Sequence, residues 1–150
     1  MMNPDHIAIV RSSWPAIAAG GDTLTVRFYE VMFAIDESAA RLFANVDMVS
    51  QRGKLFRSLA VIVDALDDLD RLLPAVAELG KRHTTYGVQR RHFDVVGQSL
   101  VLAIESVLGD DFTPAVREAW AEAYALVAAV MMRALDRAAT GVTNPGHPAY

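Results

Sequence analysis

The sequence predicts an all-α protein, because apolar residues recur at helical spacing and no strand-like alternation exceeds four residues. The chain has 150 residues, of which 53% are hydrophobic, and this length suffices for one domain with its own buried core. We therefore expect seven to eight helices with short connections. They should form one domain, residues 1–140, followed by a flexible tail, residues 141–150.

Boundary signals divide the first half of the chain into helices. Asn3 is suited to cap a helix whose first position is Pro4. Pro15 is expected to kink or end this helix, and Gly20 to stop it. Asp22 is suited to cap the next helix. Three further helices are expected in this half, over residues 24–35, 37–43 and 50–66.

The second half contains a helix that opens at Pro74 and closes at Gly87, with His83 on its apolar face. Residues 90–92, which read Arg-Arg-His, are expected to form a polar corner. Thr113 is suited to cap the last helix. Two helices are expected after the polar corner, over residues 93–107 and 116–134.

Composition and charge exclude several classes of function. The net charge of −4 and the pI of about 5.5 give no basic face for nucleic acid. Cysteine is absent, which removes disulfides, thiolate metal sites and cysteine nucleophiles. The sequence shows no signal-peptide pattern and no apolar run long enough to span a membrane. We therefore expect a cytoplasmic protein.

His83 needs a chemical explanation, because it shares a helical face with Val76, Leu79 and Tyr86. A buried imidazole is costly without a partner, which could be a backbone carbonyl, a carboxylate or a metal. The other three histidines do not provide the spacing of a zinc site. Haem supplies four nitrogens itself and needs only one histidine. The residues alone leave open a backbone-bonded core histidine and a haem ligand.

A haem would also need a flat apolar slot with few polar groups. Apolar residues that could line it are Phe28, Phe43, Leu55, Leu59 and Val88. Two polar residues, Tyr29 and Gln51, lie on helices whose other faces are apolar. From spacing alone, Tyr29 is equally a core tyrosine with its hydroxyl at the surface. Gln51 is more simply a solvated residue of the first helical turn.

Six stretches of the chain, in this order, match a family pattern. They are L-T-V-R-F-Y-E-V-M-F (24–33), R-L-F (41–43), S-Q-R-G-K-L-F (50–56), L-G-K-R-H-T-T-Y-G-V (79–88), H-F-D-V-V-G-Q-S-L (92–100) and A-W-A-E-A-Y (119–124). The chain resembles the globins, in particular single-domain bacterial globins and the globin domain of flavohaemoglobins. The resemblance extends from Asp5 to Asp136. It implies a globin fold, a three-over-three helical sandwich around a haem b pocket.

The resemblance implies a role for each of several residues. His83 would be the proximal iron ligand, and Phe43 would lie against the haem face. Tyr29 and Gln51 match the distal tyrosine and glutamine, both of which can donate hydrogen bonds to a ligand. Leu55 matches the distal apolar residue one turn beyond Gln51. Further contacts to the haem are expected from Val88, Phe93 and Lys54.

The function implied is reversible oxygen binding at a five-coordinate ferrous haem, for transport or storage, with carbon monoxide and nitric oxide as other ligands. A donor to the charged outer atom of oxygen contributes roughly 1–3 kcal/mol. Given an external reductase, nitric oxide could be oxidised to nitrate, so it stays open whether the chain is an enzyme. The alternatives are a haem-based gas or redox sensor and a haem-free structural globin. A monomer or weak homodimer is expected.

Two departures from the flavohaemoglobin pattern bear on this chemistry. In that pattern a tyrosine and a glutamate support the proximal histidine, whereas the matching residues here are Phe93 and Leu135. Neither side chain can donate or accept, so we do not expect a strong electron push toward peroxide cleavage. The chain also ends where a flavin reductase domain would begin, without a G-x-G-x-x-G motif. We therefore expect electrons from a separate partner.

Several other residues have a weaker link to the implied pocket. Charged residues that could pair with haem propionates are Lys54, Arg57, Arg82 and His92. For each of them, a solvated side chain is an equal alternative. Met48 is a conceivable sixth ligand, although a methionine in a connection more often packs. Trp120 and Tyr124 match family residues that we expect in the core.

Overall fold

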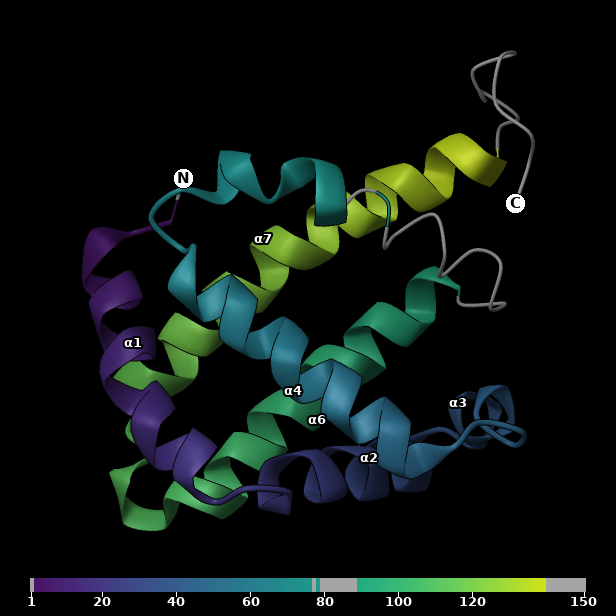
Figure 1. Ribbon diagram of the computed structural model, residues 1–150, viewed down its shortest axis with the longest axis horizontal. Helices are drawn as coiled ribbons and strands as arrows, with labels where there is room; N and C mark the ends of the chain where they lie inside the picture. The colour runs from purple at the N-terminus through teal and green to yellow at the C-terminus, as the bar shows by residue number, and fades with distance from the viewer. Residues whose placement is uncertain (1, 77, 79–88, 140–150) are drawn as a thin grey trace.

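The computed structural model describes residues 2–76, 78 and 89–139, and every regular element within them is helical (Figure 1). Six α-helices have both ends inside these ranges, and a seventh begins at Leu73. The all-α prediction is confirmed. The elements are α1 (Pro4–Ala19), α2 (Thr23–Ile35), α3 (Glu37–Leu42), α4 (Met48–Asp64), η1 (Leu69–Arg71), α6 (Arg90–Leu108), η2 (Gly109–Asp111) and α7 (Pro114–Ala139).

Two helix pairs hold this arrangement together: α2 packs against α6, and α1 packs against α7. Helices α6 and α7 form a hairpin through η2, and α4 contacts both α1 and α2 (Figure 1). Fully buried apolar side chains between the helices include Val10, Ile17, Leu24 and Ile104. Each such side chain contributes roughly 1.5–3 kcal/mol on burial. None of the helices in the described ranges is long and apolar enough to cross a membrane.

The helix starts follow the predicted capping signals at both ends of the chain. The Asn3 side chain accepts a hydrogen bond from the backbone N–H of Asp5 at 2.8 Å. The Thr113 hydroxyl accepts one from the N–H of Val116 at 3.2 Å. Asp22 is at the N-cap of α2, as predicted, but its carboxylate makes no capping bond. Its backbone is already helical, whereas a capping residue normally has an extended conformation.

Pro15 does not end the first helix. Helix α1 continues past it to Ala19, and the N–H of Gly20 then bonds back to the carbonyl of Ile17. A proline inside a helix removes one hydrogen bond and crowds the carbonyl four residues before it, and Pro15 lies on the exposed side of α1. The buried side chains of Val10 and Ile17 lie on either side of it and hold both halves of the helix against the core.

A pair of tryptophans marks the contact between α1 and α7. The ring centroids of Trp14 and Trp120 are 6.1 Å apart, and Phe56 of α4 lies 5.5 Å from Trp14. The indole N–H of Trp120 donates to the hydroxyl of Ser13 at 2.9 Å. Trp120 is therefore a core residue with its one polar group satisfied, as expected from the sequence.

The close approach of α6 and α7 depends on a glycine. A Cβ at Gly97 would lie 2.7 Å from Cε2 of Tyr124, a separation that real Cβ atoms do not tolerate. The absence of a side chain lets the Tyr124 ring lie across α6. Its hydroxyl donates to the backbone carbonyl of Phe93 at 2.5 Å. Tyr124 is accordingly packed into the helix interface, as predicted for a core residue.

Candidate functional site

Tyr29 is a buried residue of α2 surrounded by aromatic rings. Its side chain is only 6% exposed. The ring centroid lies 4.9 Å from that of Phe28, 5.8 Å from Phe33 and 5.4 Å from Phe43. Because Phe43 follows the end of α3, the turn between α2 and α3 brings its ring back onto α2. These contacts fix the direction of the tyrosine within an apolar wall.

Gln51 reaches the same place from the first turn of α4. This helix begins at Met48, because the Asp47 carboxylate accepts a bond from the N–H of Val49 at 3.1 Å. The side-chain nitrogen of Gln51 then donates to the hydroxyl oxygen of Tyr29 at 3.2 Å. The two polar residues that the resemblance assigned to the distal side are therefore adjacent in space.

The Tyr29 hydroxyl keeps its own proton available. Burial raises its pKa above the ordinary value of 10.0, and this effect outweighs the lowering by the Gln51 bond and the Arg52 charge. Gln51 uses the oxygen as an acceptor, and within the described residues no acceptor lies against the hydroxyl proton. A neutral phenol with a free proton can donate to a ligand that binds next to it.

The other predicted distal residues lie around this pair. Phe43 is half-buried, and its ring centroid is 5.7 Å from that of Phe33. Leu55, one turn beyond Gln51, is half-buried and packs against the main core. Met48 also packs against this core. Together they give an apolar surface interrupted by two polar groups.

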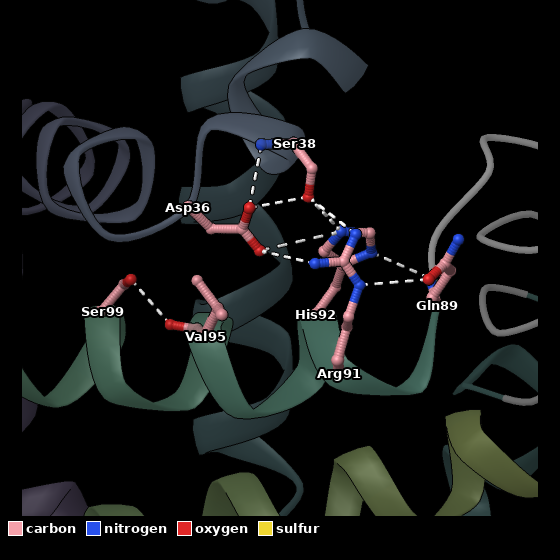
Figure 2. A network of polar contacts seen from close by, with 7 residues as sticks. All are labelled: Asp36, Ser38, Gln89, Arg91, His92, Val95 and Ser99. Carbon is pink, nitrogen blue, oxygen red and sulfur yellow. Dashed lines mark hydrogen bonds and ion pairs between the residues drawn. The ribbon is translucent and has the colours of Figure 1, made fainter.

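Several predicted residues are not brought to this place or lie outside the description. Lys54 and Arg57 are exposed, and the Arg57 guanidinium turns back toward its own helix near Gly53. His92 has both ring nitrogens bonded within the protein (Figure 2), which leaves none for a propionate. The predicted residues outside the described part of the chain are His83, Val88 and Arg82.

Phe93 lies in a small apolar cluster that is separate from the main core. It is 6% exposed and packs with Ala128, Tyr124, Met131 and Met132. The hydroxyl of Tyr124 donates to the backbone carbonyl of Phe93, so this proton is not available to a proximal histidine. The backbone of residue 135 belongs to α7, but the side chain of Leu135 lies outside the description.

Sequence reasoning missed Arg52, which follows Gln51. Its Nε atom is buried and has no hydrogen-bond partner in the described part of the chain. A buried donor of this kind normally has an acceptor, so an acceptor from elsewhere belongs beside it. The signal available in the sequence was the Q-R pair at the start of a helix whose inner face is apolar.

These residues fit a haem better than a bare metal ion. The aromatic wall around Tyr29 suits a flat apolar macrocycle. The hydroxyl proton of Tyr29 suits a gas ligand of the haem. The unpaired Nε of Arg52 suits a haem carboxylate. In the described ranges no three histidine, aspartate or glutamate side chains converge as a metal site. The iron ligand itself would come from His83, outside those ranges.

The comparisons with known proteins agree with this fit. The family model described as Globin matches residues 26–131. The flavohemoprotein of Deinococcus radiodurans is 37% identical over 136 residues, which cover 88% of this chain and 33% of that protein. The flavohemoprotein of Bacillus subtilis is 32% identical over 130 residues, which cover 85% and 33%. The chain thus spans about a third of the length of these curated relatives.

Solved structures show the same fold. A bacterial globin from Campylobacter jejuni superposes with a TM-score of 0.80 at 24% identity, covering 92% of this chain and 99% of that chain. A Rhodothermus marinus protein superposes with a TM-score of 0.85 at 24% identity, covering 96% and 100%. That protein is a nitric oxide dioxygenase candidate engineered into a carbene transferase. The predicted three-over-three helical sandwich is confirmed.

Proposed function

This chain belongs to the globin family, and we propose that it binds oxygen reversibly at a haem b, with Tyr29 and Gln51 as its distal donors. The observation that supports this most directly is the 3.2 Å bond from Gln51 to the hydroxyl of Tyr29. It leaves the hydroxyl proton free inside an aromatic wall. In contrast, the core tyrosine Tyr124 uses its own proton in a bond to the Phe93 carbonyl.

The proposal assigns the remaining haem contacts as follows. His83 holds the iron, and Phe43 lies against the haem face. Leu55 limits the distal space beyond Gln51. The further haem contacts we propose are Val88, Phe93 and Lys54. Gln51, rather than a histidine, matches the distal position, so the ferrous state without ligand should be five-coordinate.

Haem supplies reversible coordination of a diatomic gas and the electron chemistry of iron. The chain supplies the environment. Tyr29 would donate a hydrogen bond to a polar diatomic ligand, and Gln51 would hold the hydroxyl in place for this. Phe28, Phe33 and Phe43 keep the surroundings apolar, which strengthens that hydrogen bond. Carbon monoxide is less polar and gains less.

Oxidation of nitric oxide to nitrate is a further proposed use of the same site. One nitric oxide, one oxygen molecule and one electron give one nitrate ion, so each turnover needs a reductase. The similarity to flavohemoproteins and to a nitric oxide dioxygenase candidate supports this use. By holding oxygen longer, Tyr29 and Gln51 would favour reaction with nitric oxide over release of oxygen.

The test is the visible spectrum of the protein reconstituted with haem, reduced, and exposed in turn to oxygen and carbon monoxide. We expect a sharp haem band that shifts with each gas, and its loss or alteration in His83→Ala. His6→Ala is the matched control. His6 lies on α1, and its Nδ1 is 2.6 Å from Oε2 of Glu122 on α7, so its loss should not affect the haem band. A wild-type protein without a haem band would rule out the proposal.

A further inference from the structure

The imidazole of His92 is buried in the first turn of α6 and is bonded through both of its nitrogens (Figure 2). The backbone N–H of Gln89 donates to Nδ1 at 2.9 Å. Nε2 lies 3.1 Å from the hydroxyl oxygen of Ser38. Because Nδ1 accepts, the ring proton must be on Nε2, which donates to Ser38. The geometry therefore requires a neutral imidazole of one defined tautomer.

The Ser38 hydroxyl, which accepts from His92, also links the imidazole to the start of α3. It donates to Oδ1 of Asp36 at 2.7 Å, and the same oxygen caps α3 by accepting the N–H of Ser38 at 2.8 Å. Arg91 completes the group, with Nη2 at 3.0 Å from the Ser38 hydroxyl and Nη1 at 3.6 Å from Oδ2 of Asp36. The bond from the Gln89 N–H to Nδ1 is the one in this network that requires His92 to be neutral.

The place of this network in the fold gives it a consequence. Helix α3 leads directly into Phe43, the residue proposed to lie against the haem face. Gln89 is the N-cap of α6 and follows the segment that contains His83, the proposed iron ligand. His92 thus joins α3, which positions one wall of the proposed pocket, to the end of the segment with the proposed ligand.

We propose that neutral His92 is a positioning residue, which fixes Gln89 at the start of α6 by accepting from its N–H and ties it to α3 through Ser38. The consequence for haem rests on the proposed function, whereas the tether itself does not. If Nδ1 of His92 took up a proton, it could no longer accept the bond from the Gln89 N–H, and two N–H groups would face each other. Acidification therefore releases Gln89.

The electrostatic surroundings favour the neutral form. Burial, and then the positive charge of Arg91, hold the pKa of His92 below its ordinary value of 6.5, while Asp36 opposes them. Asp36 faces the imidazole from the start of α3, with its Oδ2 4.0 Å from Nε2. Arg91 is the neighbour of His92 in α6. At neutral pH the tether should be fully formed.

The tether is tested in solution by NMR and amide hydrogen exchange, with or without haem. We expect an unprotonated Nδ1 and a protonated Nε2 for His92 at pH 7. In His92→Leu, which keeps bulk without an acceptor, exchange at the Gln89 amide should accelerate at least roughly fivefold. His6→Leu is the control and should leave that amide unchanged. A Nδ1-protonated tautomer, or unchanged Gln89 exchange in His92→Leu, would overturn the inference.

The consequence for haem is tested by the rate of haem transfer to an excess of scavenger protein between pH 8 and pH 5. The wild-type rate should rise on acidification. His92→Gln, whose side-chain oxygen can accept but does not titrate, should flatten this profile, and His6→Gln should retain it. An unchanged profile in His92→Gln would count against His92 as the positioning residue. If the wild type takes up no haem, the proposed function fails, while the Gln89 exchange still decides the tether.

Discussion

The side-chain nitrogen of Gln51 and the hydroxyl oxygen of Tyr29 are 3.2 Å apart, a bond that joins α4 to α2. Gln51 is the donor in this pair, so Tyr29 can direct its own proton elsewhere. The two residues therefore act as one unit, in which Gln51 orients the hydroxyl and Tyr29 presents it. Removing either side chain should therefore change how strongly a bound ligand is held by hydrogen bonding.

Replacing Tyr29 with phenylalanine removes the hydroxyl and keeps the ring contacts. We expect oxygen to dissociate roughly 10- to 100-fold faster, because a hydrogen bond to a charged acceptor contributes about 1.5–3 kcal/mol. Stopped-flow displacement of oxygen by carbon monoxide measures the rate. Tyr124→Phe is the control, since that hydroxyl donates to the Phe93 carbonyl and should not affect oxygen. An unaltered rate in Tyr29→Phe would show that its hydroxyl points away from the ligand.

The proximal side should gain electron push when the flavohaemoglobin pair is restored. Phe93 packs among apolar side chains, so Phe93→Tyr alone places a phenol there without a carboxylate. The double variant Phe93→Tyr, Leu135→Glu supplies both groups and should make the proximal imidazole more basic. We expect a higher iron–histidine stretching frequency in the ferrous resonance Raman spectrum of the double variant. An identical frequency in wild type and double variant would refute the assignment of these two positions.

A methyl group at Gly97 should destabilise the fold. It would lie 2.7 Å from the Tyr124 ring, so the ring must move and α6 and α7 must separate. Overpacking of this kind costs about 1–3 kcal/mol, more than the gain of up to about 1 kcal/mol in helix propensity. Gly53→Ala is the matched control, because its nearest contact is the flexible end of Arg57. Urea unfolding should show a loss for Gly97→Ala and none for Gly53→Ala.

Ser13→Ala should weaken the contact between α1 and α7. The indole N–H of Trp120 would lose its acceptor while staying buried, at a cost of about 1–3 kcal/mol. Thermal unfolding followed by tryptophan fluorescence measures the effect. Ser12→Ala is the neighbouring control: Ser12 is exposed, and its hydroxyl donates only to the Ile9 carbonyl. Equal stabilities of the two variants would mean that the Trp120 bond contributes nothing.

Stability should fall on mild acidification because of His92. Its pKa in the folded protein is lowered by burial and by Arg91, so the unfolded chain takes up the proton first. The stabilisation is complete above pH 6.5 and is lost as the pH falls through the lower folded value. Between pH 7.5 and pH 5, the free energy of unfolding should decrease more in wild type than in His92→Gln. Parallel pH dependences would contradict this.

Local sequence chemistry was enough to predict most helix boundaries. Asn3 with Pro4 and Thr113 with Pro114 are cap and first-turn pairs whose effect does not depend on the rest of the fold. Asp22 is at the capping position but makes no capping bond, because its backbone there is already helical rather than extended. The type of side chain at that position does not determine the backbone dihedral angles there.

The site was less predictable from spacing. Gln51 looks like a solvated first-turn residue until α2 and α4 cross, and only the family resemblance indicated that it lies beside Tyr29. His92 follows two arginines, so the sequence suggested a polar corner, whereas α6 begins at Arg90 and Ser38 of α3 covers the imidazole. Both burials result from contacts between helices far apart in sequence, which no local pattern reports.

The burial of Tyr29 also limits what the oxidised protein can do. Its raised pKa keeps the phenol protonated well into the alkaline range, so it does not become a tyrosinate. The Tyr29 oxygen could bind a ferric iron as an anion only after losing this proton. Burial of the phenol therefore favours its use as a hydrogen-bond donor over its use as an anionic iron ligand.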